Sequence, residues 1–118
     1  MSAMVRRKGK GLVRMAVDHI VGKHHPNRGG KHQHHEIILL HGLLSSRRGW
    51  GRFGSRLLQA LETQARSKSS SFSSACGAVA TTHSFRIHAL DCRNHGDSIH
   101  TDHHSLEAIS DDLSLYME

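Results

Sequence analysis

The pattern of apolar and polar positions predicts two strands and two helices in residues 36–118. Residues 36–40 (EIILL) hold a continuous apolar run after Glu36, which is typical of a strand buried on both faces in a parallel sheet. Residues 85–90 alternate apolar and polar, which indicates a second strand. Apolar residues recur at helical spacing over 50–66 and 106–116, with Ser105 as the expected N-cap of the second helix. The order strand, helix, strand, helix predicts an α/β fold with a parallel strand pair and a right-handed crossover.

Residues 1–35 differ from the rest and predict a flexible, basic, His-rich arm ahead of a domain at 36–118. Residues 1–31 hold eight Lys or Arg and one acid, whereas residues 32–118 hold eight basic and nine acidic residues. Apolar positions from Leu12 to Val21 recur at helical spacing and predict a short amphipathic helix. A helix that follows basic residues suits a mitochondrial presequence, but a surface helix or a disordered tail gives the same pattern.

Two low-complexity segments interrupt this pattern. Residues 24–35 contain five histidines beside Pro and Gly and are interpreted as a turn and linker, because their spacing fits no closed metal site. Residues 67–82 are rich in Ser, Ala and Thr and predict a flexible insertion. Cys76 and Cys92 make no disulfide framework, which favours free thiols in a reducing compartment. No apolar run reaches the roughly 20 residues that span a bilayer, and no secretory signal is recognisable.

The first motif with chemical meaning is His41-Gly42-Leu43, which directly follows the first predicted strand. Ligands of open α/β sheets bind at the carboxyl ends of the strands. Gly42 lets the backbone approach a substrate closely, and the N–H of Leu43 can then act as an oxyanion donor. One such donor stabilises a tetrahedral intermediate by about 3–4 kcal/mol. A plain turn at the end of a strand explains the same three residues.

The second motif, DCRNHGDS at 91–98, follows the second predicted strand. Asp91, His95 and Ser98 lie too close in sequence to face each other across a cleft, so they are not interpreted as a catalytic triad. Asp91 and Asp97 are expected to accept hydrogen bonds from loop backbone, with Gly96 in a left-handed turn. The residues given this structural role are His41, Asp91, Arg93, Asn94, His95, Gly96, Asp97 and Ser98.

Together, these motifs resemble the α/β-hydrolase superfamily, and within it a branch of small serine esterases and lipases in which the loop reads D-x-R-N-H-G-x-S. The resemblance covers residues 36–118. It implies that the two strands are the third and fourth of the family's sheet, and it assigns the oxyanion hole to the Leu43 N–H with Gly42 beside it. It further implies hydrolysis of small carboxylic esters or thioesters through an acyl-serine intermediate, with no cofactor and no metal, in a mitochondrial or cytoplasmic protein.

The resemblance ends before the nucleophile. No G-x-S-x-G elbow occurs before Glu118, and the family's acid and histidine follow later still, so the catalytic triad is expected to be absent and the chain inactive alone. The family's two initial antiparallel strands are not recognisable upstream of residue 36. A non-catalytic alternative is a binding protein that uses its basic arm on a polyanion or an anionic membrane surface, although no nucleic-acid motif accompanies the arm.

Overall fold

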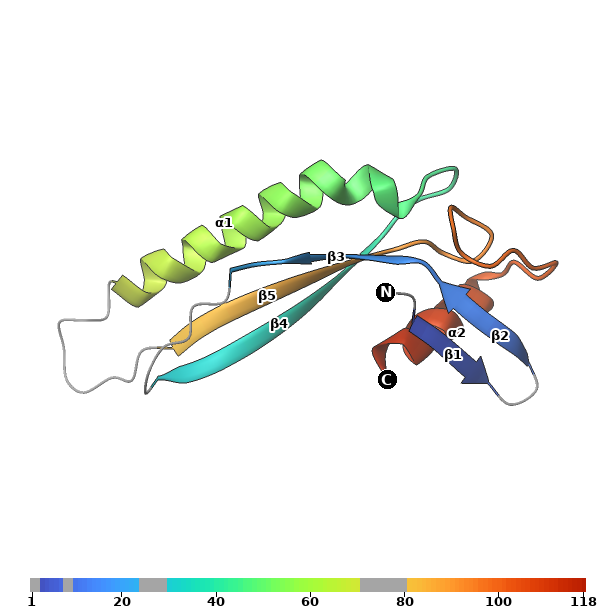
Figure 1. The fold of residues 1–118 in the computed structure, drawn as a ribbon, viewed down its shortest axis with the longest axis horizontal. Helices are drawn as coiled ribbons and strands as arrows, with labels where there is room; N and C mark the ends of the chain where they lie inside the picture. Colours follow the sequence, from blue (N-terminus) through green and yellow to red (C-terminus); the bar gives the residue numbers. More distant parts are fainter. Residues whose placement is uncertain (1–2, 8–9, 24–29, 71–80) are drawn as a thin grey trace.

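The computed structural model describes residues 3–7, 10–23, 30–70 and 81–118, and Figure 1 shows their arrangement. Its elements, in chain order, are β1 (Ala3–Arg7), β2 (Lys10–Met15), β3 (Val17–Val21), β4 (Lys31–Leu40), the 3₁₀ turn η1 (Arg47–Trp50), α1 (Gly51–Ser70), β5 (Thr81–Leu90) and α2 (Leu106–Met117). Strands β1 and β2 form an antiparallel hairpin, and the other three strands form a sheet in the order β3-β5-β4.

The central strand β5 pairs with both of its neighbours. It runs parallel to β4, with Lys31 opposite Thr81 and Leu40 opposite Leu90, so the predicted parallel pair is confirmed. It runs antiparallel to β3, with Val17 opposite Leu90. The chain is therefore a small α/β protein whose three-stranded sheet is mixed.

The helix predicted between Leu12 and Val21 is wrong. These residues form β2 and β3, and β3 pairs with β5 along its whole length. Val17, Ile20 and Val21 are β-branched and suit a strand, so pairing and burial against β5 prevail over the helical spacing. Three strands, β1, β2 and β3, therefore lie upstream of residue 36, where none was recognisable from the sequence.

Both segments that were interpreted as linkers are shorter than expected. Strand β4 begins at Lys31, so the last five residues of the His-rich linker are strand residues, and residues 24–29 lie outside the described part. Helix α1 continues to Ser70 and β5 begins at Thr81, which leaves only 71–80 of the Ser-rich segment outside the described residues.

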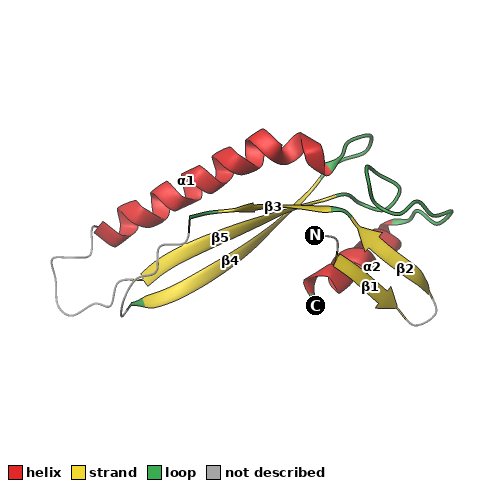
Figure 2. Cartoon of the chain, viewed as in Figure 1, coloured by secondary structure: helices red, strands yellow, loops and turns green. Residues whose placement is uncertain are grey.

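Helix α1, predicted over 50–66, covers one face of the sheet (Figure 2). Leu58 of the helix and Ile87 of β5 are buried. Gly54 is buried where the helix meets β3, and a Cβ at this position would lie 2.4 Å from the Cδ1 of Ile20. A larger residue would push the helix off the sheet, so this glycine contributes close packing that outweighs its poor helix propensity.

Helix α2 covers only the carboxyl-terminal end of the other face. Its predicted N-cap is confirmed, because the Ser105 hydroxyl accepts a hydrogen bond from the N–H of Ala108 at 3.2 Å. Leu113 and Tyr116 of α2 pack on a small core of Met15, Val17 and Leu90. The remaining part of this face, toward the amino ends of β4 and β5, carries polar side chains.

Candidate functional site

Two loops meet at the carboxyl ends of the parallel strands, one at residues 41–46 and the other at 91–105 (Figure 1). The N–H of Cys92 donates to Nε2 of His41 at 3.1 Å, which joins them directly. Because Nε2 accepts, the imidazole of His41 carries its proton on Nδ1, which donates to the carbonyl of Gly42 at 2.8 Å. The side chain of His41 is 2% exposed, so it is a buried brace between the loops.

Asp91 organises both loops from a fully buried position. Its Oδ1 accepts from the N–H of Arg47 at 2.6 Å, and its Oδ2 accepts from the N–H of Asp97 at 3.0 Å and from the guanidinium of Arg47. Burial alone would raise the pKa of Asp91, but the backbone hydrogen bonds from Arg47 and Asp97 outweigh it and lower that pKa. The expected role of Asp91, binding loop backbone, is thus seen directly.

Arg47 was not singled out in the sequence, yet it connects three parts of the fold. Its guanidinium contacts Asp91, Asp97 at 2.8 Å and Asp18 of β3 at 3.1 Å. Burial alone would lower the pKa of Arg47, but hydrogen bonds to these three carboxylates raise it. Asp97 therefore binds arginine side chains here, whereas the sequence predicted that it binds backbone. The only available signal was charge balance, since arginine is the usual partner of buried carboxylates.

Ser98 is a buried structural bridge. Its hydroxyl donates to the carbonyl of Asp91 at 2.6 Å and accepts from the N–H of Ala16 at 2.9 Å, which fastens the loop to the chain between β2 and β3. His95 faces the carbonyl of Arg93 through Nδ1 at 3.0 Å. Ser98 thus donates its proton to backbone and not to an imidazole, in agreement with the rejection of Asp91, His95 and Ser98 as a triad.

The rest of the second loop is held by side chains. Arg93 forms a two-pronged pair with Asp112 of α2, with its Nε and Nη2 at 2.7 and 2.6 Å from the two carboxylate oxygens. Asn94 has a φ of 63° and accepts from the N–H of Thr101 at 2.6 Å. Cys92 is a buried free thiol, and burial raises its pKa, as do the nearby Asp91 and Asp112.

Gly42 and Leu43 lie on the exposed surface of the first loop. Leu43 is 81% exposed, and the next residue, Leu44, has a left-handed φ of 61°. Within the described part of the chain, the N–H of Leu43 donates to no protein acceptor. The arrangement therefore holds a free backbone donor at the carboxyl end of β4, above a buried network that fixes the loop.

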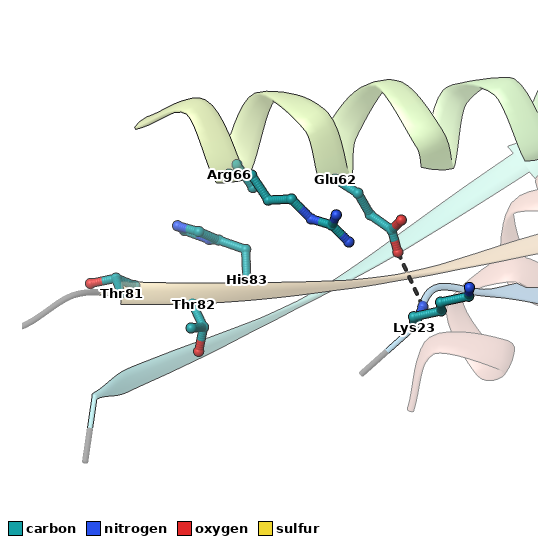
Figure 3. Close-up of a pocket in the computed structure, with 7 residues that line it drawn as sticks. Lys23, Glu62, Arg66, Thr81, Thr82 and His83 are labelled. Carbon is teal, nitrogen blue, oxygen red and sulfur yellow. Dashed lines mark hydrogen bonds between the residues drawn. The ribbon is translucent and has the colours of Figure 1, made fainter. Parts of the chain in front are cut away.

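A hollow of about 320 Å³ lies at the opposite end of β5, between α1 and the amino ends of the strands (Figure 3). Lys23, Glu62, Arg66 and His83 line it, and the carboxylate of Glu62 accepts from the N–H of Lys23 at 3.1 Å. Charges of both signs border this hollow, so its lining favours no single class of ligand.

The described residues contain no group of three or more His, Cys, Asp or Glu side chains placed to hold a metal ion. No helix in the described ranges is long and apolar enough to cross a membrane. Comparison with family models, with curated proteins and with solved structures finds no match to this chain.

Sequence reasoning missed a second polar cluster, on the sheet face that α2 leaves open. His32, His34 and Glu36 alternate along β4 and share one face, beside Ser84 and His88 of β5. A period of two was visible in the sequence, since these three residues are spaced at i, i+2 and i+4. It was obscured by the interpretation of the histidines as a linker.

Replacing Gly96 with Ala is expected to lower the free energy of unfolding by about 2 kcal/mol or more. Gly96 has a φ of 51°, and a Cβ there would lie 2.1 Å from Oδ2 of the buried Asp91. Urea denaturation followed by circular dichroism measures the change. Gly42→Ala is the matched control because a Cβ at Gly42 meets nothing within 4 Å, and an equal loss in both variants would contradict the argument.

Acid is expected to destabilise the fold through His19 and Glu36. Burial, and then the neighbouring His88, lower the pKa of His19 below 6.5. Burial alone would raise the pKa of Glu36, but hydrogen bonds from His88 and His34 lower it below 4.5. In both cases the unfolded chain binds protons more readily, so stability falls as the pH drops below 6.5 for His19 and below 4.5 for Glu36.

Thermal unfolding at about pH 7.5 and about pH 5.5 isolates the His19 contribution. We expect the midpoint to be lower at the acidic pH and the difference to shrink in His19→Gln. His100 is exposed, so His100→Gln should leave the difference as it is. The same reduction in both variants would show that histidine content, and not the position of His19, sets the pH dependence.

Proposed function

We propose that this chain is the amino-terminal part of a serine hydrolase that acts on small carboxylic esters or thioesters. In this proposal, the loop at 41–46 supplies the oxyanion side of the active site, and the nucleophile belongs to sequence that follows Glu118. The observation that carries the proposal is the free N–H of Leu43, which lies at the carboxyl end of a parallel strand on a loop braced by His41.

Two further features support it. The loop at 91–98 matches D-x-R-N-H-G-x-S, and its buried members Asp91 and Ser98 fasten the oxyanion loop and the upstream strands to β5. The family's fold begins with antiparallel strands ahead of the parallel pair, and here β3 pairs antiparallel with β5 beside β4. Both features agree with a partial fold of this type, and neither identifies a substrate.

The chemistry follows from the position of the donor. When a serine hydroxyl attacks an ester carbonyl, negative charge develops on the carbonyl oxygen. In α/β-hydrolases, one of the two N–H groups that bind this oxygen comes from the loop after the third strand, which corresponds here to the loop after β4. A fixed donor in this place stabilises the transition state without reorganisation, because Asp91 and His41 already hold the loop.

The decisive first experiment is to sequence the transcript beyond the codon for Glu118. The proposal expects a G-x-S-x-G motif within about thirty residues, preceded by a strand pattern and followed by a helix pattern. A transcript that continues without this motif, or that stops at Glu118 in every case, overturns it.

The second experiment tests Leu43 in the protein translated from that complete transcript. Leu43→Pro removes the N–H, and we expect it to lower kcat for a short-chain ester by about 10²- to 10³-fold. Leu43→Ala keeps the N–H and removes only an exposed side chain, so it should leave kcat unchanged. Equal activity of the proline and alanine variants would exclude Leu43 as an oxyanion donor.

A further inference from the structure

The open face of the sheet carries a continuous chain of hydrogen bonds that converges on Glu36. From one side, the Ser84 hydroxyl lies 2.6 Å from Nδ1 of His34, whose Nε2 lies 2.5 Å from Oε1 of Glu36. From the other side, the Tyr116 hydroxyl lies 2.6 Å from Nδ1 of His88, whose Nε2 contacts Oε2 of Glu36. Two imidazoles therefore share one carboxylate, and each one connects it to a hydroxyl.

One set of tautomers satisfies these contacts. Glu36 in its ionised form only accepts, so His34 and His88 carry their protons on Nε2 and donate them to its two oxygens. Nδ1 of His34 is then an acceptor, and the Ser84 hydroxyl donates to it. Hydrogen bonds from His88 and His34 outweigh burial and lower the pKa of Glu36, which keeps the carboxylate ionised near neutral pH.

The arrangement is that of a nucleophile (Ser84), a general base (His34) and a carboxylate that orients the base (Glu36). The imidazole that contacts the hydroxyl is oriented by the carboxylate, and all three residues lie on two strands that pair with each other. On the other side of Ser84, Nε2 of His32 lies 3.0 Å from the hydroxyl oxygen, where it can donate to an oxygen that develops charge beside it. Both His34 and Glu36 are 44% exposed, so a small substrate has access.

We infer that Ser84 is a nucleophile that accepts an acyl group from activated esters, with His34 as its general base and Glu36 as the residue that orients His34. This site is separate from the proposed oxyanion loop, because it lies on the open face toward the amino ends of β4 and β5, and all of its residues belong to this chain.

The reaction has two balanced steps. Ser84 Oγ attacks the ester carbonyl while its proton passes to Nδ1 of His34; the bond to the leaving alcohol breaks, and that alcohol takes the proton from His34. Water then attacks the acyl-serine with His34 again as the base, which releases the carboxylic acid and restores the Ser84 hydroxyl. Glu36 accepts from Nε2 of His34 throughout and stabilises the transient imidazolium without taking its proton.

The test uses the 118-residue chain itself with p-nitrophenyl acetate. We expect a burst of p-nitrophenol and an acetyl group on Ser84, located by mass spectrometry of the digested protein. Ser84→Ala should abolish the burst, and His34→Gln and Glu36→Gln should each slow it by at least about tenfold.

The matched control is His35→Gln. His35 is on the opposite face, where it stacks on His83 and Phe85, so this variant loses one imidazole without touching the relay. We expect its burst to equal that of the parent chain, and circular dichroism checks that every variant is folded. If acetyl groups appear only on histidine or lysine, if Ser84→Ala keeps the burst, or if His34→Gln and His35→Gln slow it equally, then the inference is wrong.

A failure here leaves the proposed hydrolase intact, because that proposal depends on Leu43 and on a nucleophile that follows Glu118. Conversely, a transcript without the elbow motif would not contradict the inference that Ser84 is acylated. The two experiments therefore give independent answers.

Discussion

Replacing Asp91 with Asn is expected to lower the free energy of unfolding by about 3–5 kcal/mol, as is typical when one partner of a buried ion pair is removed. The carboxylate is fully buried, and it accepts from two backbone N–H groups and from the guanidinium of Arg47. Asparagine keeps the size but places an NH₂ group against one of these donors. A small domain is stable by only about 5–15 kcal/mol, so a large fraction of Asp91→Asn should be unfolded at modest urea concentrations.

Asp97→Asn is the matched control for this prediction. Asp97 also contacts Arg47, but its carboxylate is 53% exposed, so solvent screens the pair and replaces the lost interaction. We expect its urea midpoint to stay close to that of the parent chain. Comparable losses in both variants would mean that the charge on Arg47, and not the buried backbone hydrogen bonds of Asp91, determines the stability of the loops.

The sequence predicted those parts of the fold in which the local pattern agrees with the tertiary strand pairing or with local capping. Residues 37–40 are apolar, and they lie in a strand that pairs in parallel with the strand containing 85–90. The predicted burial of this strand on both faces is wrong, because Leu40 is 39% exposed and β4 is an edge strand. Ser105 caps α2 because its hydroxyl accepts from an N–H of the first helical turn. This interaction depends only on neighbouring residues, so the sequence predicts it. The left-handed turn at Gly96 is local in the same sense.

The prediction failed where long-range pairing decides the structure. Between Leu12 and Val21, spacing alone favoured a helix. No nearby residue indicates that β3 pairs with a strand more than sixty residues later, as Val17 does with Leu90. The His-rich segment failed for the same reason. Lys31 to His35 are polar, and their strand conformation depends on the hydrogen-bond ladder with β5 and not on their own burial.

In the candidate site, too, the sequence predicted the roles that depend on local residues and missed those that depend on long-range contacts. The backbone roles of Gly42 and Leu43 and the hydrogen bonding of Asp91 follow from residues next to each strand end, and sequence predicted where these residues gather. Arg47 could not be found this way, because its importance comes from carboxylates on two distant segments: Asp18 of β3, and Asp91 and Asp97 of the second loop. The relay through Ser84 and His34 was equally hidden, since it requires the register that sets β4 beside β5.

The pair between Arg93 and Asp112 gives the second large effect, because it joins the 91–98 loop to α2 across a buried interface. The side chains are 9% and 4% exposed, and both guanidinium prongs meet the carboxylate. Arg93→Met and Asp112→Leu should each cost about 3–5 kcal/mol, since each variant leaves an uncompensated buried charge. Arg93 also donates to the carbonyl of His103 at 3.2 Å, so its loss should be the larger of the two.

The double variant Arg93→Met/Asp112→Leu should recover most of this loss, because apolar side chains of similar size can replace a buried ion pair at little cost. Urea denaturation of the four proteins in a double-mutant cycle measures the coupling, which we expect to be at least about 2 kcal/mol. Arg93→Lys adds a test of geometry: a single ammonium cannot contact both oxygens in parallel, so it should recover only part of the stability. Additive single losses in the cycle would contradict this account. They would mean that the apolar contacts of Leu113 and Tyr116 hold α2 on the sheet.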